Sequence, residues 1–201
     1  MHAGVEPWLA DARGRRTEAV LSVAEGLECG PFCAGAGPSP LLYRALVTAY
    51  LVQNDVLNAT WALRRWAVAK PAGGDEQQDR VRESLERVAQ HCGRYAYSEA
   101  FREAAAALLG NAAAEGVTLL GDCLLDYLAA RHTHQRRTFY GEDSRMEKHA
   151  SELGVTPADL EVRLQRVRDD GLQRIEGDVG DDTNERLREA LCCMMEAGRV
   201  V

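Results

Sequence analysis

Apolar residues recur every three or four positions along most of the chain, which is the spacing of an amphipathic α-helix. This pattern predicts a helix over Thr17–Leu27 and another over Leu42–Tyr50, the second opened by Ser39–Pro40, a cap followed by proline. Asn54–Asp55 predicts a turn with a new cap, after which a helix continues through Trp66. Because the connection is so short, these two helices are expected to form an antiparallel hairpin.

Three further helices are expected before residue 138. Asp75 and Gln78 resemble a capping box ahead of a helix, and Ser98 is expected to cap the next one. A strongly apolar helix starts at Val117 and is predicted to end in the basic turn Arg131–Arg137, whose charge suits a helix C-terminus. The apolar stripe of the first of these helices consists of Val81, Leu85, Val88 and Cys92.

The pattern changes after residue 137. Thr138–Tyr140 is a short β-prone segment, and a two-turn helix is expected from Met146 to Gly154. Thr156–Asp159 is a capping box with proline at the first helical position, and it predicts another helix. The inner face of that helix is predicted to be Leu160, Leu164 and Val167.

The last thirty residues predict a small β element and a terminal helix. A strand is expected over Leu172–Asp178, a turn over Val179–Asp182, and a helix from Thr183 onward. Short helix, capped helix, strand and loop is the order of a winged-helix module. We therefore predict a mostly α-helical protein: a helical-hairpin array over residues 1–137, then a winged helix and C-terminal amphipathic helix over 138–201, as one continuous unit.

Composition and charge narrow the function classes. The chain has 201 residues, 46% of them hydrophobic, and a net charge of −7. A chain of this length buries enough surface to fold without metal or disulfide, so its six cysteines are expected to be reduced. The longest apolar run, Ala104–Leu109, is far shorter than a membrane span of about 18 residues, and Glu6 and Asp11 interrupt any signal peptide. We expect a soluble, intracellular protein without a cofactor.

A zinc site is not predicted. Cys29 and Cys33 do not have the spacing of a Cys-x-x-Cys pair, and His132 and His134 lie about a hundred residues away. Histidines at i and i+2 of a helix point about 200° apart, so they do not easily share one ion. We therefore expect the two cysteines to lie in the core or a loop as free thiols, and the two histidines to be solvated.

No catalytic residue is expected either. Cys123 lies among Leu119, Leu120 and Leu124, where a free cysteine packs as a small hydrophobe rather than acting as a nucleophile. Gly35–Gly37 is not followed by the Lys-Ser or Lys-Thr of a phosphate-binding loop. We therefore expect no enzymatic activity and no small-molecule substrate.

Charge also argues against direct binding of nucleic acid. The candidate recognition helix, Pro157–Asp170, carries three arginines against four acidic residues. The predicted wing, Gly171–Glu185, carries one arginine against five acidic residues. Phosphate contacts require the opposite sign.

Protein partners are the remaining use of a winged helix. A wing leaves an open strand edge that another chain's strand can extend, and an amphipathic terminal helix suits a groove or bundle. The alternative is that the terminal apolar stripe folds back on its own domain, in which case acidic substitutions at Leu191 and Met195 would unfold the protein. The candidate partner-binding residues are Leu172, Arg174, Glu176, Leu187, Leu191, Met194 and Met195.

Two segments resemble a known family. Leu41–Ala59, followed by Trp66, is similar to a Leu- and Tyr-rich helix, Asn-Asp turn and second helix of the COP9 signalosome subunit eight family. His149–Leu160 is similar to the helix, Leu-Gly and Pro-acidic segment at the centre of that family's winged helix. The similarity runs from about Thr17 to about Leu172 and implies the PCI fold.

This resemblance implies a non-catalytic scaffold subunit of the COP9 signalosome, which removes a ubiquitin-like modifier from cullins in the cytoplasm and nucleus. Its partners would be other subunits of that complex. The equivalent PCI subunit of the proteasome lid or of translation initiation factor three is an alternative. A winged-helix nucleic-acid binder and a thiol enzyme are alternatives from other classes. The predicted hairpin around Asn54–Asp55 also implies that Trp61 is buried. Its change to Ala is then expected to destabilise the fold by about 3 to 5 kcal/mol.

Overall fold

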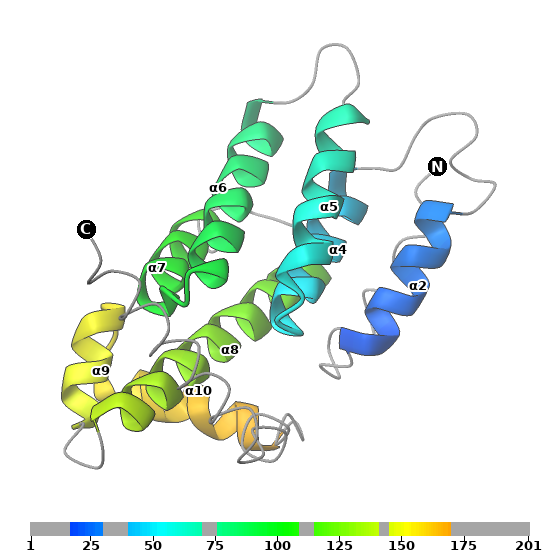
Figure 1. Ribbon diagram of the computed structural model, residues 1–201. Helices are drawn as coiled ribbons and strands as arrows, with labels where there is room; N and C mark the ends of the chain where they lie inside the picture. Colours follow the sequence, from blue (N-terminus) through cyan, green and yellow to red (C-terminus); the bar gives the residue numbers. More distant parts are fainter. Residues whose placement is uncertain (1–16, 30–39, 70–75, 109–114, 141–144, 170–201) are drawn as a thin grey trace, which may run out of the picture. The chain divides into compact units, whose positions relative to one another are not determined.

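A computed structural model describes residues 17–29, 40–69, 76–108, 115–140 and 145–169, and in these residues its regular structure is helical, without strands (Figure 1). The predicted mostly α class is therefore confirmed. The chain divides into two compact units, Met1–Leu164 and Gln165–Val201. None of the described helices combines the length and the apolar character that crossing a bilayer requires.

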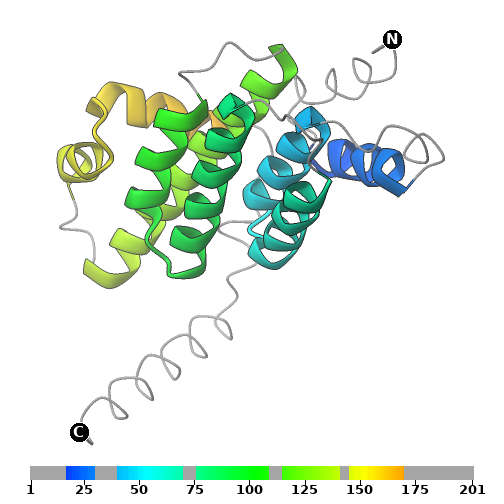
Figure 2. The ribbon, with the colours of Figure 1, turned by 90° about the horizontal axis from the view of Figure 1, so that it is seen from above.

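The first hairpin consists of α4 (Pro40–Val52) and α5 (Val56–Val68), with α2 (Thr17–Cys29) packed against α4 (Figures 1 and 2). Its turn forms as the sequence predicts. Asn54 has a φ of +60°, a conformation that asparagine tolerates. The Asp55 carboxylate accepts the backbone N–H of Asn58 at 3.0 Å and so caps α5.

The second hairpin consists of α6 (Glu76–Gly93) and α7 (Tyr97–Leu108), and its α6 side packs against the first hairpin. The predicted α6 stripe, Val81, Leu85, Val88 and Cys92, is buried. The predicted cap at Ser98 is wrong, because α7 already begins at Tyr97. The Ser98 hydroxyl instead donates to the carboxylate of Glu99 at 2.8 Å.

The long helix α8 (Glu115–Tyr140) contacts α4 and α7, and its apolar stripe is buried through Leu120, Leu124 and Leu128. The basic turn at Arg131–Arg137 does not end this helix, and the predicted β-prone segment Thr138–Tyr140 is helical. The Thr138 hydroxyl donates to the His134 carbonyl one turn earlier at 3.0 Å, which accommodates a β-branched residue in a helix. Residue 137, the predicted boundary between the two parts, therefore lies inside α8.

Two shorter helices follow with the predicted caps. The first, α9 (Met146–Leu153), ends at Gly154, which adopts a φ of +74° that glycine takes without steric cost. The second, α10 (Pro157–Asp169), begins where the Thr156 hydroxyl accepts the N–H of Asp159 at 3.1 Å. Its predicted inner face, Leu160, Leu164 and Val167, is buried.

In the second unit the structure describes only Gln165–Asp169, the last turns of α10. Within it the Gln165 side-chain amide donates to the carboxylate of Asp169 at 2.7 Å. The predicted strand, turn and terminal helix fall in residues 170–201, outside the described part of the chain.

Candidate functional site

The partner-binding residues predicted from the sequence lie outside the described residues. They are Leu172, Arg174, Glu176, Leu187, Leu191, Met194 and Met195. Candidate surfaces can instead be sought within the described helices of the first unit.

Helix α5 presents an apolar face to solvent. Leu57, Trp61, Arg64 and Val68 are spaced by four, three and four positions, so they lie along one side of the helix, and we call them the exposed α5 face. The exposed fractions of Leu57, Trp61 and Val68 are 69%, 49% and 87%. The opposite side of α5 is buried and consists of Ala59, Ala62, Leu63 and Trp66.

A cation–π contact organises the centre of this face. The guanidinium carbon of Arg64 lies 4.9 Å from the centroid of the Trp61 ring. Such a pair contributes about 0.5 to 1 kcal/mol at an exposed site. Tryptophan and arginine are also the residue types most enriched among the energetically dominant residues of protein interfaces.

The prediction that Trp61 is buried is wrong, and Trp66 fills the core position instead. Trp66 is 5% exposed and stacks on Tyr43 of α4, with the ring centroids 6.3 Å apart and an interplanar angle of 12°. Both sides of α5 carry apolar residues, so the helical period fits either tryptophan. The buried side is distinguished by its small residues, Ala59 and Ala62, which allow α4 to approach closely.

A groove of about 520 Å³ between α5 and α6 adjoins the exposed α5 face. Arg64 lines this groove and also belongs to the exposed face, so the two surfaces are continuous. The other residues that line the groove include Val56, Leu63 and Ala67 from α5 and Arg82, Glu86 and Gly93 from α6. The combination offers apolar surface beside charged groups of both signs.

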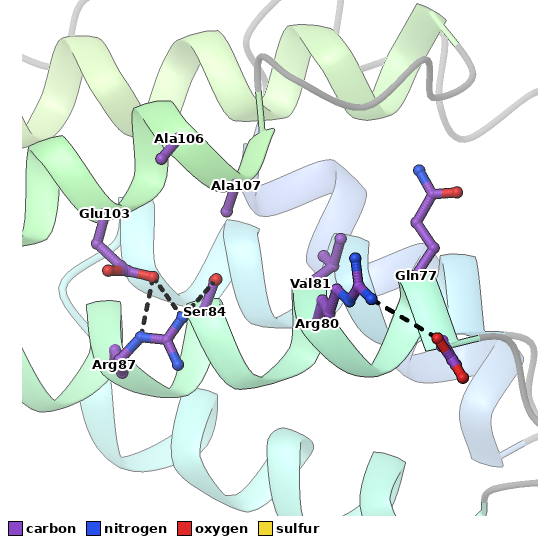
Figure 3. Close-up of a pocket in the computed structure, with 9 residues that line it drawn as sticks. Gln77, Arg80, Val81, Ser84, Arg87, Glu103, Ala106 and Ala107 are labelled. Atoms are coloured by element: carbon purple, nitrogen blue, oxygen red, sulfur yellow. Dashed lines mark hydrogen bonds and ion pairs between the residues drawn. The ribbon is translucent and has the colours of Figure 1, made fainter.

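A second groove of about 620 Å³ lies between α6 and α7 (Figure 3). Its arginines are already engaged. Arg87 donates to the Glu103 carboxylate through Nε at 2.9 Å and Nη2 at 2.7 Å, and Arg80 lies 3.6 Å from Glu76. The nearby Arg87 guanidinium lowers the pKa of Glu103. Because each of these cations already faces a carboxylate, the groove is poorly suited to an anionic ligand.

A buried polar cluster joins α8 to α9. The Glu152 carboxylate contacts Nε2 of His132 at 2.9 Å and accepts two hydrogen bonds from Arg136, both at 2.9 Å. His149 lies edge-on to His132, with ring centroids 5.9 Å apart and an interplanar angle of 84°. Burial lowers the pKa of His132, and the neighbouring Glu152 opposes that shift.

His132 is therefore not the solvated histidine that the sequence predicts. Its side chain is 2% exposed and that of His149 is 1% exposed, while His134 is half-buried. The ligand atoms offered by His132, His149 and Glu152 all lie within 4.8 Å of one another. The spacing of His149 and Glu152 places both side chains on one face of α9. No signal in the neighbouring sequence indicates that these two residues contact His132.

The thiols of the described core have no features of a nucleophile. Cys123 is buried, as predicted, and so is Cys92, and neither of the two forms a disulfide. Burial raises the pKa of the Cys92 thiol to about 12. The reactive thiolate of Cys92 is therefore scarce at neutral pH.

One arginine of the predicted recognition helix has a structural role. Arg163 Nη1 lies 2.7 Å from Oδ1 of Asp126, whose side chain is fully buried in α8. The Arg163 guanidinium also lies 5.7 Å from the centroid of the Phe101 ring. This arginine is therefore committed to the contact between α8 and α10 rather than available to a phosphate.

Comparison with known proteins gives no relative for this chain. No family model matches it, and no significant match was found among curated proteins or solved structures.

Proposed function

We propose that this protein is a non-catalytic scaffold subunit of a multi-subunit complex, and that the complex is the COP9 signalosome. The support for the complex is the resemblance of Leu41–Ala59 and His149–Leu160 to the subunit eight family. The two segments correspond to the α4–α5 hairpin and to α9 with the start of α10. The PCI fold, the winged helix and a location in cytoplasm and nucleus are parts of the same proposal.

The exposed α5 face carries the proposal. Leu57, Trp61 and Val68 place apolar surface in water along one line, and covering that surface contributes about 25 cal/mol per Å². Isolated exposed apolar residues are common, but an aligned set with a central tryptophan is typical of an interaction site. The exposed α5 face does not enclose a small molecule among polar side chains, so it suits a protein partner better than a small substrate.

The alternatives from other classes have less support. Arg163 is engaged by Asp126, and the helix that carries it has a net negative charge, so phosphate binding is disfavoured. A thiol enzyme needs an accessible thiolate, whereas Cys92 and Cys123 are buried. The proteasome lid and translation initiation factor three remain the alternatives within the scaffold class.

Purification of the tagged full-length chain from cells tests this proposal, with the co-purifying subunits identified by mass spectrometry. We expect the COP9 signalosome subunits in near-stoichiometric amounts, and their loss with Trp61→Asp. Val23→Asp is the matched control, because Val23 is 41% exposed and lies on α2, outside both the exposed α5 face and the proposed winged helix.

Each outcome decides between the candidates. Subunits of the proteasome lid or of initiation factor three would favour those complexes instead. Recovery of no complex would contradict the scaffold function. Recovery of the same subunits with Trp61→Asp and wild type would contradict the proposed use of the exposed α5 face. Circular dichroism of both variants checks that the helices remain folded.

A further inference from the structure

We propose that His132, His149 and Glu152 form a zinc-binding site that joins α8 to α9. Among the described residues these three side chains offer two imidazole nitrogens and one carboxylate oxygen within 4.8 Å of one another. Two histidines and one glutamate are a ligand set that zinc uses in proteins, with a fourth position left for water or another ligand. This site is independent of the proposed scaffold function.

One pair of the cluster already lies close to the spacing that the ion requires, and all three ligand atoms lie within 4.8 Å of one another. Zinc binds histidine nitrogen and carboxylate oxygen at about 2.1 Å each, which places tetrahedral ligand atoms about 3.4 Å apart. Nε2 of His132 and Oε2 of Glu152 now lie 2.9 Å apart, so this pair needs to open by only about half an ångström. Side-chain rotations of His149 and Glu152, which share one face of α9, can bring the third ligand inward.

Burial makes the two histidines suitable ligands. Their side chains are 1% and 2% exposed, so a bound ion would be held where competing water is scarce. His132 and Arg136 also border a groove of about 500 Å³ that is lined by Tyr95, Gln135 and Phe139 among others. The carboxylate of Glu152 supplies the negative charge that a divalent cation needs.

Arg136 has two opposing effects on this site. The Arg136 guanidinium donates to both carboxylate oxygens of Glu152. If zinc binds Oε2, Arg136 can still donate to Oε1 and so orient the carboxylate. Its positive charge at the same time repels the ion and lowers the affinity. Two imidazoles suit zinc better than magnesium or calcium, because those cations prefer an all-oxygen ligand set.

Zinc titration of the chelator-treated full-length protein tests this site, with bound metal measured by mass spectrometry after dialysis. We expect one equivalent of zinc to bind, and the melting temperature to rise by about 5 to 10 °C at zinc concentrations 100-fold above Kd. Cobalt(II) is the second probe, and wild type should give the visible absorption of a four-coordinate ion with nitrogen and oxygen ligands.

Glu152→Gln is the most informative variant, because Glu152 is the least buried of the three ligands and Gln keeps its size. We expect its zinc affinity to fall by more than about 10-fold. His91→Gln is the control, since it removes a histidine on α6 that lies outside the cluster. The site would be refuted by wild type that binds no stoichiometric zinc or cobalt, or by equal binding in wild type and Glu152→Gln.

Discussion

Helices α4 and α5 are the two arms of one hairpin and have the same length, yet they differ in how they are buried. In α4 all eleven residues from Leu42 to Val52 are buried. In α5 only four of thirteen residues are buried, and the exposed α5 face is apolar at three of its four positions. The two helices are therefore not equivalent layers of one core.

Their neighbours explain the difference. Helix α4 packs against α2, α5, α6 and α8, whereas α5 packs against α4 and α6. Surrounded in this way, α4 buries even Arg44 and Thr48, and desolvation lowers the pKa of the Arg44 guanidinium. The Thr48 hydroxyl donates to the Arg44 carbonyl at 2.7 Å. Apolar residues on α4 thus build the core, while those on the outer side of α5 remain exposed to solvent.

The largest effect is expected for Trp66→Ala. Trp66 connects the two helices through its stacking on Tyr43, and removal of a buried large aromatic costs about 3 to 5 kcal/mol of unfolding free energy. Urea unfolding followed by circular dichroism measures this value. A loss below about 1 kcal/mol would show that the seam between α4 and α5 is not part of the core.

Leu46→Ala in α4 is expected to cost about 3 kcal/mol, since Leu46 is fully buried and the change leaves a cavity. Leu57→Ala in α5 makes the same chemical change at a side chain that is 69% exposed and should cost less than about 0.5 kcal/mol. The two variants are compared by their unfolding midpoints in urea. Equal losses would overturn the contrast between the helices.

Asp55→Ala tests the turn that separates the two helices. Its carboxylate accepts the Asn58 N–H, and loss of such a cap costs about 1 kcal/mol. Asp55→Asn should retain most of that stability, because asparagine is also a good cap. A thermal melt of both variants checks this, and a loss as large for Asn as for Ala would point to charge rather than capping.

Only a small effect on stability is expected for Trp61→Ala, far below that of Trp66→Ala. Its ring is half exposed and lies against the Arg64 guanidinium, so the cost should be below about 1 kcal/mol. The same variant should weaken the capture of partner subunits, which separates a binding role from a core role. Unfolding in urea and co-purification are measured on one preparation, and a loss near that of Trp66→Ala would place Trp61 in the core.

Local signals in the sequence located several helix ends correctly. The caps at Asp55 and Thr156 depend on side chains that accept a backbone N–H three positions further on, and the stop at Gly154 depends on a positive φ that glycine adopts without steric cost. The cap predicted at Ser98 failed for the same kind of reason, since its hydroxyl has an equally local competitor in Glu99. The end of α8 differs from the prediction, since the helix runs past the basic residues 131–137 to Tyr140, and Arg136 pairs with Glu152 on α9.

Helix type, the hairpin turn and the buried stripe of α6 follow from the sequence by itself, because they depend on residues within one or two helical turns of each other. Only tertiary packing decides which tryptophan of α5 lies in the core. Only tertiary packing also brings His132 to His149 and Glu152. Periodicity fixes which residues share a side of a helix, but not which side its neighbours cover. That choice depends on contacts between segments far apart in the chain, and no local pattern records them.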